Sequence, residues 1–542
     1  MELFLKLFGK FITLIYSCFD RVLINGYIDI FHNQNTVAYF FKNITTAHSI
    51  SKEAFSKRTN VYQKWVESFM INNNIFNKWA EKDERKEDTV KPYLQKAIRL
   101  WRKKGQYGVY FIFKSMETGN TFRSILPKYK NADENYRFIR KARKRFTHFY
   151  FYIFDPVLGN MSMRVATYFP FHTAYWINGH NFIEQELIKN NVSFKKNDNA
   201  FLKVDELSAL KTASDNLTSE IIRQRFNYWT FVLGPKFSEH ERQSCNLNYS
   251  YYIQQIEYCI NFIFKKNFYI HNLFQKASQL GLISFLSDKI SNIFGYRISP
   301  RHKGKFSNHF DSFEHSHHNF KICFKKSFAK QYQKLLAFLR NEISSYNLKE
   351  FGINKALDNL PLIKEKFTAL LDRFTSSQAQ LFNIHFDHDI FPNLAKPVLR
   401  GKTKIAGIKI QDDRMLRLME ILLRSNAKIQ PFASAEIYNH LLKFFRLSET
   451  DYSITQFRYD LRKLIAHDIV ERINSSYSYR LTDFGLKVII NFVIFRKNIY
   501  GPVLNSQFNY QPDIKHAFNS KLEKAYYKID KDIGCLYKLL AA

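Results

Sequence analysis

The chain has 542 residues and carries 82 Lys and Arg against 48 Asp and Glu, a formal net charge of +34. Hydrophobic residues make up 45% of it, with 54 Phe and 32 Tyr, so the composition excludes a disordered chain, a collagen-like repeat and a small disulfide-stapled scaffold. Such an excess of positive charge costs self-repulsion in a compact fold, and it predicts a polyanionic partner, nucleic acid.

The cysteines are few, odd in number and widely spaced: Cys18, Cys245, Cys259, Cys323 and Cys535. No CxxC pair occurs, which argues against a disulfide framework or a zinc ribbon and favours reduced thiols in the cytoplasm. At the N-terminus, apolar residues recur at helical spacing from Leu3 to Ile15, as in a buried amphipathic helix rather than a signal peptide. No segment reaches the roughly 18 apolar residues of a membrane span, so we expect a soluble cytoplasmic protein without a membrane partner.

Residues 1–105 are predicted to be mostly helical after a short strand at 22–28. From Gly108 the pattern changes to two hairpins, the first with a turn at 117–120 and the second with a turn at 156–160. Both are rich in aromatic and β-branched residues, so we expect an antiparallel sheet here. A short helix follows at 182–189, and residues 199–207 are either a strand or the start of a helix.

The second half of the chain is predicted to begin with helix over 206–300. A loop rich in Gly, Pro, Ser and His follows at 297–318, then a strand at 319–327, then a helix, or a helix leading into a strand, at 330–346. Pro392, Pro397 and Gly401 mark 385–410 as a linker. No internal repeat interrupts this order.

These patterns predict an α+β protein in which helical and antiparallel-sheet N-terminal and middle regions precede a C-terminal winged-helix domain. The expected regions follow in chain order. They are a mostly helical region (1–105), a basic antiparallel sheet domain (106–205), a helical region (206–300), a His-rich strand and helix region (301–384), a linker (385–410), the winged-helix domain (411–500) and a tail helix (501–542).

Three helical patterns followed by a polar hairpin characterise residues 411–497. This order is typical of the winged helix, in which the third helix enters the major groove and the hairpin contacts the backbone or minor groove. The residues predicted to contact DNA are Gln456, Arg458, Arg462 and Lys463 on the third helix and Arg472, Tyr477 and Arg480 on the hairpin. The alternative is a module that makes protein contacts or covers a larger core.

The densest positive charge lies at 85–150, with 18 Lys and Arg against 5 Asp and Glu. There a cation cluster, predicted to lie on a helix, leads into an aromatic strand, which suits single-stranded or structured nucleic acid because rings stack on bases while cations track phosphates. The cluster is Arg137, Arg140, Lys141, Arg143, Lys144 and Arg145, and Arg99, Arg102, Lys103 and Lys104 extend it if the two segments are neighbours. The alternative is a solvated helical face above an aromatic core.

Two sets of residues could form a metal site. On a strand, His315 and His317 would point the same way and could share a divalent cation, although surface histidines without a metal are the alternative. Asp20, beside one strand, and Asp155, at the end of another, could hold Mg or Mn for phosphodiester cleavage if their strands are neighbours. Asp155 precedes a proline and is equally typical of a turn. No motif of an NTPase, a dinucleotide-binding protein or an α/β-hydrolase is present.

Several stretches resemble an uncharacterised family of bacterial proteins with a C-terminal winged helix. They are FDRVLINGYI at 19–28, FYIFDPVLGNMSMRVATYFPFHTAYWINGHNF at 151–182, AKPVLRGKTKIAGI at 395–408 and RYDLRKLIAHDIVERINSSYSYRLTDFG at 458–485. The resemblance covers most of the chain. It implies a fold at the C-terminus and no particular activity.

A second likeness is to rolling-circle replication initiators and relaxase-type nucleases. FLRNEISSY at 338–346 matches their L-R-x-E pattern through Leu339, Arg340 and Glu342, but Cys323 and Phe324 stand where Tyr and Asp are expected in the preceding strand. The HSH at 315–317 approximates their His-hydrophobic-His strand. The resemblance implies that Tyr346, or Tyr332, is a nucleophile that forms a phosphotyrosine ester.

The leading hypothesis is a nucleic-acid-binding protein of a mobile genetic element, which binds DNA through the winged helix and could cut a strand with Mg or Mn. One alternative is a non-catalytic RNA-binding protein that partners a structured non-coding RNA. Another is a transcription regulator. The expected partners are therefore DNA, structured RNA or both.

Overall fold

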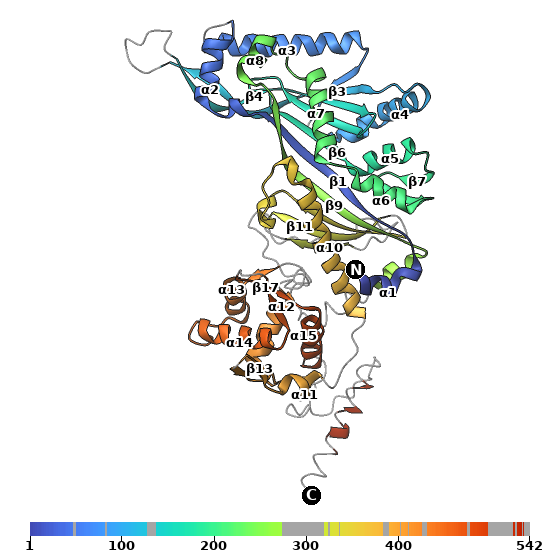
Figure 1. Cartoon of the computed structure of the whole chain (residues 1–542), viewed down its shortest axis with the longest axis vertical. Helices are drawn as coiled ribbons and strands as arrows, with labels where there is room; N and C mark the ends of the chain where they lie inside the picture. The colour runs from blue at the N-terminus through green and yellow to red at the C-terminus, as the bar shows by residue number, and fades with distance from the viewer. Residues whose placement is uncertain are drawn as a thin grey trace, which may run out of the picture.

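The computed structural model describes most of the chain and shows a mixture of helices and sheets (Figure 1). The α+β class is thus confirmed. The described ranges are 1–46, 50–81, 84–126, 137–273, 319–323, 326–334, 337–382, 390–401, 403–409, 411–424, 431–473, 477–496 and a few positions between 524 and 535. Among them, no helix combines the length and apolarity that crossing a membrane requires.

A ten-stranded sheet organises the chain between residues 12 and 345, and it takes strands from four of the predicted regions. Its order is β10-β11-β12-β9-β1-β6-β5-β4-β3-β2, antiparallel throughout except for the parallel pair β2 and β3. The strands are β1 (Ile12–Ile28), β2 (Phe76–Trp79), β3 (Gly108–Ile125), β4 (Phe138–Asp155), β5 (Gly159–Ala166), β6 (Thr173–Asn178), β9 (Tyr249–Phe264), β10 (Asn319–Cys323), β11 (Ser327–Lys334) and β12 (Phe338–Ser345).

Different helices cover the two faces of this sheet (Figure 1). On one face, Phe149 of β4 packs against Tyr62 of α3 (Lys52–Asn72), and Tyr175 of β6 stacks on Phe226 of α7 (Ser219–Leu233) at 3.9 Å between ring centroids. The same face is covered by α1 (Glu2–Phe8) and α10 (Leu360–Phe382) further along, and α2 (Gln34–Tyr39) and α8 (Glu239–Cys245) lie towards the other end.

The opposite face, which we call the α5 face, carries the candidate site. It is covered by α4 (Lys86–Lys104), α5 (Gly179–Lys189), α6 (Leu207–Asp215) and the hairpin of β7 (Phe194–Asn197) and β8 (Ala200–Val204). Because successive strand residues alternate between faces, Tyr150 and Tyr152 of β4 turn towards α4, whereas Phe149 and Phe151 turn towards α3.

Residues 390–496 build a second hydrophobic cluster around Met415, Phe457 and Ile489. Its sheet has the order β15-β17-β16. The elements are α11 (Ile390–Ala395), β13 (Val398–Arg400), β14 (Thr403–Ile405), α12 (Asp413–Arg424), β15 (Phe432–Ala433), α13 (Ser434–Phe445), α14 (Ile454–Ala466), β16 (Val470–Arg472), β17 (Ser478–Leu481) and α15 (Asp483–Phe495). These bounds confirm the helices and hairpin predicted here, and show that the predicted linker contains helix and strand.

Several predicted helices and one predicted turn are wrong. Residues 117–120 lie inside the continuous strand β3, and the cations at 140–145 lie on strand β4 instead of a helix. Strand β9 and most of strand β11 occupy segments that were expected to be helical, and α1 ends at Phe8. Strand β12 agrees with the alternative in which 330–346 ends in a strand, although β11 takes the place of the helix expected before it. For β9 the reason is that it lies inside the sheet and its second half is buried on both faces, so it forms an apolar run that periodicity cannot distinguish from a buried helix. The hairpin of β4 and β5 and the helix at 182–189 are confirmed.

Candidate functional site

A β-bulge in β1 turns two consecutive side chains towards the α5 face. The pairing of β1 with β9 shifts register between Phe19 and Val22, so one extra residue is accommodated there. Asn178, which lies opposite Arg21 on β6, donates a hydrogen bond to Asp20 at 2.8 Å. Bulges re-aim side chains in this way, often beside functional sites. The two side chains are those of Asp20, which is buried, and Arg21, which lines a pocket on this face.

Two rows of mostly polar residues cross β11, β12, β9 and β1 on the α5 face. Residues directly opposite one another in antiparallel strands share a face, so the register defines both rows. The first row is Lys330, Glu342, Cys259 and Cys18, and the second is Tyr332, Arg340, Asn261 and Tyr16. Buried polar groups are costly unless they are hydrogen-bonded, which makes their partners informative.

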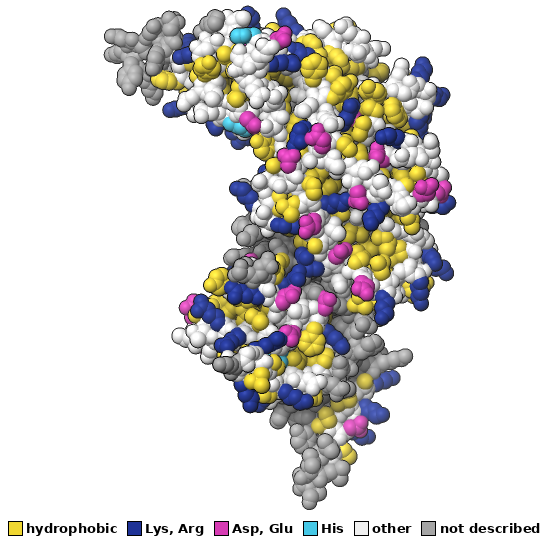
Figure 2. Space-filling model, in the orientation of Figure 1, with side chains coloured by type: hydrophobic (Ala, Val, Ile, Leu, Met, Phe, Trp, Pro, Cys, Tyr) yellow, Lys and Arg dark blue, Asp and Glu magenta, His cyan; other side chains and the backbone are white. Residues whose placement is uncertain are grey.

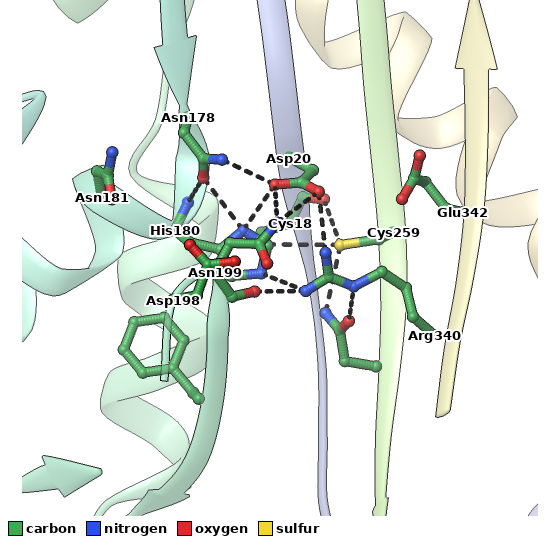
Figure 3. Close-up of polar contacts among 12 residues, drawn as sticks. Cys18, Asp20, Asn178, His180, Asn181, Asp198, Asn199, Cys259, Arg340 and Glu342 are labelled. Carbon is green, nitrogen blue, oxygen red and sulfur yellow. Dashed lines mark hydrogen bonds and ion pairs between the residues drawn. The ribbon is translucent and has the colours of Figure 1, made fainter. Parts of the chain in front are cut away.

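Asp20 and Arg340 form the centre of this network (Figure 3). Arg340 Nη1 donates to Asp20 Oδ2 at 2.9 Å, its Nε donates to Asn261 Oδ1 at 2.7 Å, and its Nη2 donates to the carbonyl of Asn199. Asp20 also accepts hydrogen bonds from Asn178 and from Asn199. The Arg340 side chain is 0% exposed and that of Asp20 7%. Both carboxylate oxygens are therefore occupied by protein donors.

Asp20 is held in its charged form. Burial by itself raises the pKa of this carboxyl, but the hydrogen bonds from His180 and Asn199 and the charge of Arg340 outweigh burial and bring the pKa well below its usual range. A buried pair of this kind is not strongly stabilising in itself, but the loss of either partner leaves an uncompensated charge in a dry interior.

Cys18, Cys259 and His180 meet beside this ion pair, and we call them the thiol–imidazole cluster. Cys18 Sγ lies 3.4 Å from His180 Nε2 and 3.9 Å from Cys259 Sγ, and all three residues are buried. Burial alone raises the pKa of the Cys259 thiol, but the hydrogen bond from Cys18 and the charge of Arg340 lower it below its usual range. The three residues come from β1, β9 and α5, so no sequence spacing points to them.

Glu342 is a second buried acid in the rows. The Tyr332 hydroxyl donates a hydrogen bond to Glu342 Oε2 at 3.0 Å, and Lys330 Nζ lies 2.8 Å from Oε1. Burial raises the pKa of Glu342 to about 7, because the charge of Lys330 offsets only part of the desolvation while Glu257 and Asp20 add to it. This carboxyl therefore titrates near neutral pH.

A pocket of about 790 Å³ opens on the α5 face beside the network. Asn178 and Asn199 line it and also hold Asp20, so the pocket and the buried ion pair share a wall. Its aromatic lining is Trp101, Tyr150, Tyr152, Phe154 and Trp176, and its cations are Arg21, Lys86, Arg102 and Lys196. The lining also contains the acids Glu87, Glu184 and Asp198, and Glu184 pairs with Lys196 at 2.6 Å and with Arg102 at 3.8 Å. Flat aromatic walls with charges of both signs between them suit a planar, polar ligand.

Asp155 does not meet Asp20, because β5 and β6 separate their strands in the sheet. Its Oδ1 accepts from the N–H groups of Val157 and Leu158 at 2.8 and 2.7 Å. Its Oδ2 accepts from Arg225, at 2.9 and 2.6 Å, and from Trp229 at 2.7 Å. The predicted Mg or Mn site between the two acids is therefore not formed. Asp155 instead links the β4–β5 turn to α7 through these hydrogen bonds.

The two predicted nucleophiles lie in different surroundings. Tyr346 follows the last residue of β12 and is 46% exposed. Its backbone N–H donates to the carbonyl of Lys326 at 3.3 Å, which places it at the end of the β11–β12 pair. Tyr332 instead donates to Glu342 within the rows. The predicted metal ligands His315 and His317 lie outside the described residues.

The two predicted cation groups of the middle region lie at opposite ends of the β3–β4 pair. Arg99, Arg102, Lys103 and Lys104 are exposed on the last turns of α4. This helix leads to Gly108, which pairs with Phe154, whereas Arg145 pairs with Thr118, ten residues further along β3. Ten strand residues span about 33 Å. The two groups therefore do not form one patch. The α4 cations lie at a helix C-terminus, where the helix dipole favours positive charge, and Arg102 lies 3.8 Å from Glu184.

The distal part of β3 and β4 forms an exposed positive surface, which we call the basic ribbon. Its members are Arg123, Arg140, Lys141, Arg143, Lys144 and Arg145. Among the described residues none of them forms an ion pair with an acid, although Lys144 Nζ lies 4.4 Å from the ring centroid of Tyr168. Arg123 lies directly opposite Arg140. Like charges opposite each other destabilise a strand pair, so an anion bound to the ribbon would reduce the repulsion between its cations. Lys and Arg side chains are spread widely over the visible face of the molecule (Figure 2). Arg137, just outside the ribbon, donates to Ser124 at 3.5 Å.

The predicted DNA contacts on α14 divide into two groups. Arg458 and Arg462 are exposed, with Tyr459 between them. Lys463 is instead buried, with its Nζ 3.6 Å from Asp412, so the prediction of a phosphate contact there is wrong. Gln456 takes part in the capping box at the N-terminus of α14, in which its Oε1 accepts a hydrogen bond from the N–H of Ser453 at 2.9 Å.

The hairpin residues divide in the same way. Arg480 pairs with Glu471 directly across the β16–β17 pair, at 2.7 and 2.8 Å, so its charge is already neutralised. The Arg472 guanidinium lies 5.1 Å from the ring centroid of Tyr477, which is 77% exposed. Arg472 and Tyr477 are therefore the exposed part of the predicted hairpin contact.

Comparison of the chain with protein-family models, with curated proteins and with solved structures gave no match. The resemblances noted in the sequence therefore remain hypotheses, and the geometry of the residues carries the functional argument.

Replacement of Glu342 by Gln should change how stability depends on pH. The folded-state pKa of about 7 lies above the ordinary value of 4.5, so the native state binds more protons and the free energy of unfolding of the wild type falls as pH rises from about 4.5 to about 7. The variant lacks this decline, and its stability relative to the wild type should rise by up to about 3 kcal/mol over that range. Denaturant unfolding at several pH values measures the difference.

The control for this experiment is Glu365→Gln, which neutralises an exposed acid on α10. Its difference from the wild type should stay flat with pH. A flat difference for Glu342→Gln as well would show that Glu342 is already ionised at acidic pH.

Replacement of Asp155 by Ala should destabilise the fold by about 3–5 kcal/mol, since it leaves Arg225 without its buried partner. The matched control is Asp358→Ala, which removes the exposed partner of Arg223 on the same helix, α7, and should cost less than about 1 kcal/mol. Both values come from denaturant unfolding. Unchanged stability together with loss of a metal-dependent nuclease activity would identify Asp155 as catalytic instead.

Proposed function

We propose that this chain binds nucleic acid and that double-stranded DNA is its partner. The basic ribbon carries the proposal, because its six cations lie on two paired strands and have no acidic partner among the described residues. The major groove of B-DNA is about 12 Å wide and admits a two-stranded ribbon. The major groove of A-form RNA is too narrow and deep for side chains to read, which favours DNA over a structured RNA.

The C-terminal elements supply a second contact. We take α12 to α15 and the β15-β17-β16 sheet as a winged helix, with α13 and α14 as the helix-turn-helix and the β16–β17 hairpin as the wing. Arg458 and Arg462 then lie on the outer face of the recognition helix, and Arg472 and Tyr477 lie on the wing. This arrangement supports duplex DNA for the same geometric reason as the ribbon does.

The proposal is binding and not strand cleavage. Asp20 and Asp155 have their carboxylate oxygens occupied by protein donors and lie on strands that are not neighbours. Neither acid is free to hold the Mg or Mn of a nuclease. Membership of a mobile genetic element depends on the resemblance to replication initiators alone, and the proposal does not require it.

The triple variant Arg140→Gln, Arg143→Gln and Arg145→Gln should weaken binding to duplex DNA. Each lost phosphate contact lowers the slope of log Kobs against log salt concentration by about 0.9, so the slope should fall by about 2 to 3. Fluorescence anisotropy with a labelled duplex between about 50 and 200 mM salt gives both the affinity and the slope.

The matched control is the triple variant Arg99→Gln, Lys103→Gln and Lys104→Gln, which removes the same number of charges from the end of α4. Its salt slope should stay near that of the wild type. Equal losses in both triple variants would mean that only net charge matters and that the ribbon is not the interface. If a double-stranded RNA of the same length binds more tightly than the DNA duplex, the RNA-binding alternative replaces the proposal.

The double variant Arg458→Gln and Arg462→Gln should reduce the salt slope by about 2, since both cations face solvent on α14. Lys463→Gln is the matched control, because Lys463 lies on the same helix but is buried against Asp412. It should leave the DNA affinity unchanged and lower the melting temperature. A wild-type slope in the double variant would remove α14 from the interface.

A further inference from the structure

We propose that the thiol–imidazole cluster of Cys18, Cys259 and His180 is a binding site for a thiophilic d¹⁰ metal ion, zinc or copper(I). Two thiolates and an imidazole are the ligands that such ions prefer. The site is separate from the proposed DNA-binding surfaces, and it does not depend on them.

The spacing of the ligand atoms fits a single ion. Metal–thiolate bonds of about 2.3 Å and metal–imidazole bonds of about 2.0 Å place two sulfurs about 3.8 Å apart and sulfur about 3.5 Å from nitrogen when the angles are tetrahedral. The observed separations are 3.9 Å between the two Sγ atoms and 3.4 Å between Cys18 Sγ and His180 Nε2. All three ligand atoms lie within 4.8 Å of one another.

Asp20 provides the support that a metal-binding histidine usually has. A histidine ligand commonly donates its other ring N–H to a carboxylate, which fixes the tautomer and the orientation of the ring. Asp20 Oδ1 lies 3.2 Å from His180 Nδ1, so a proton on Nδ1 leaves Nε2 with a lone pair that can bind an ion. Asp20 is itself held by Arg340, Asn178 and Asn199 (Figure 3).

A bound metal replaces one contact of Arg340, the one with the imidazole of His180. Arg340 Nη2 lies 3.3 Å from His180 Nε2, and this contact is given up when Nε2 coordinates the ion. Arg340 keeps its bonds to Asp20, Asn261 and the carbonyl of Asn199. Zinc balances the charge of two thiolates, while Arg340 and Asp20 balance each other, so the dry site remains neutral. The protons of the two thiols leave on binding.

The same two cysteines could instead form a disulfide, since they lie directly opposite on β1 and β9. Their sulfurs are 3.9 Å apart, whereas a disulfide bond is about 2.05 Å long. The two states exclude each other, which makes the disulfide a useful outcome of the test.

The test is metal analysis of the full chain, purified under reducing conditions without a metal-chelating tag. We expect about one zinc or copper per chain by plasma mass spectrometry, with the identity of the ion distinguishing the two. Cys259→Ser should lose the metal, and Cys245→Ser should retain it, because Cys245 lies on α8 outside the cluster.

Reconstitution keeps the proposal testable if Cys259→Ser does not fold. Metal-stripped wild-type chain should bind Co²⁺ with thiolate charge-transfer absorption if the site is zinc-like, or take up Cu⁺ in the presence of a copper(I) chelator if it is copper-like. Either ion should raise the melting temperature. The proposal is overturned if the wild type contains no metal and the stripped chain binds neither ion. It is also overturned if peptide mapping, without added reductant, of the chain as purified finds a Cys18–Cys259 disulfide.

Discussion

The buried ion pair of Asp20 and Arg340 is the constraint on which the α5 face of the sheet depends. Asp20 lies on β1 and Arg340 on β12, with β9 between them, and asparagines from β6 and from the β7–β8 hairpin complete the bonds of the pair. Arg340 is wholly buried, and a buried guanidinium without an anion would be untenable. The register of three strands, the bulge in β1 and the position of α5 must therefore agree with one another.

The pair also explains why polar chemistry collects at one place in a largely apolar sheet. Once Arg340 is held by Asp20, its remaining donors reach Asn261, Asn199 and His180. His180 in turn lies against Cys18. The thiol–imidazole cluster and the wall that the pocket shares with Asp20 thus both depend on one charge pair. The basic ribbon lies on β3 and β4, at the other side of the sheet order, and in the part of the chain that the structure describes its cations pair with no acid.

Local patterns predicted the local features of this protein. The β4–β5 hairpin, the helix at 182–189 and the C-terminal helices each depend on periodicity and turn residues within a short window, so sequence reasoning found them. The polar network joins Asp20 to residues 158 and 320 positions away, and no window contains that information. The L-R-x-E likeness did single out Arg340 and Glu342, which share a face on β12, although their partners are Asp20, Lys330 and Tyr332 instead of a nucleophile at Tyr346.

Two cations among the predicted DNA contacts have acidic partners in the fold, because a cation in the sequence carries no record of its partner. Lys463 looks like a member of the polar face of α14, yet Asp412 lies against it in the fold. Arg480 is similarly neutralised by Glu471 across a strand pair. On the basic ribbon the positions across β3 hold Asn120, Gly119 and Thr118 instead of acids. A net charge of +34 therefore predicts an anionic partner without locating its site, and the pairing of strands decides which cations have acidic neighbours.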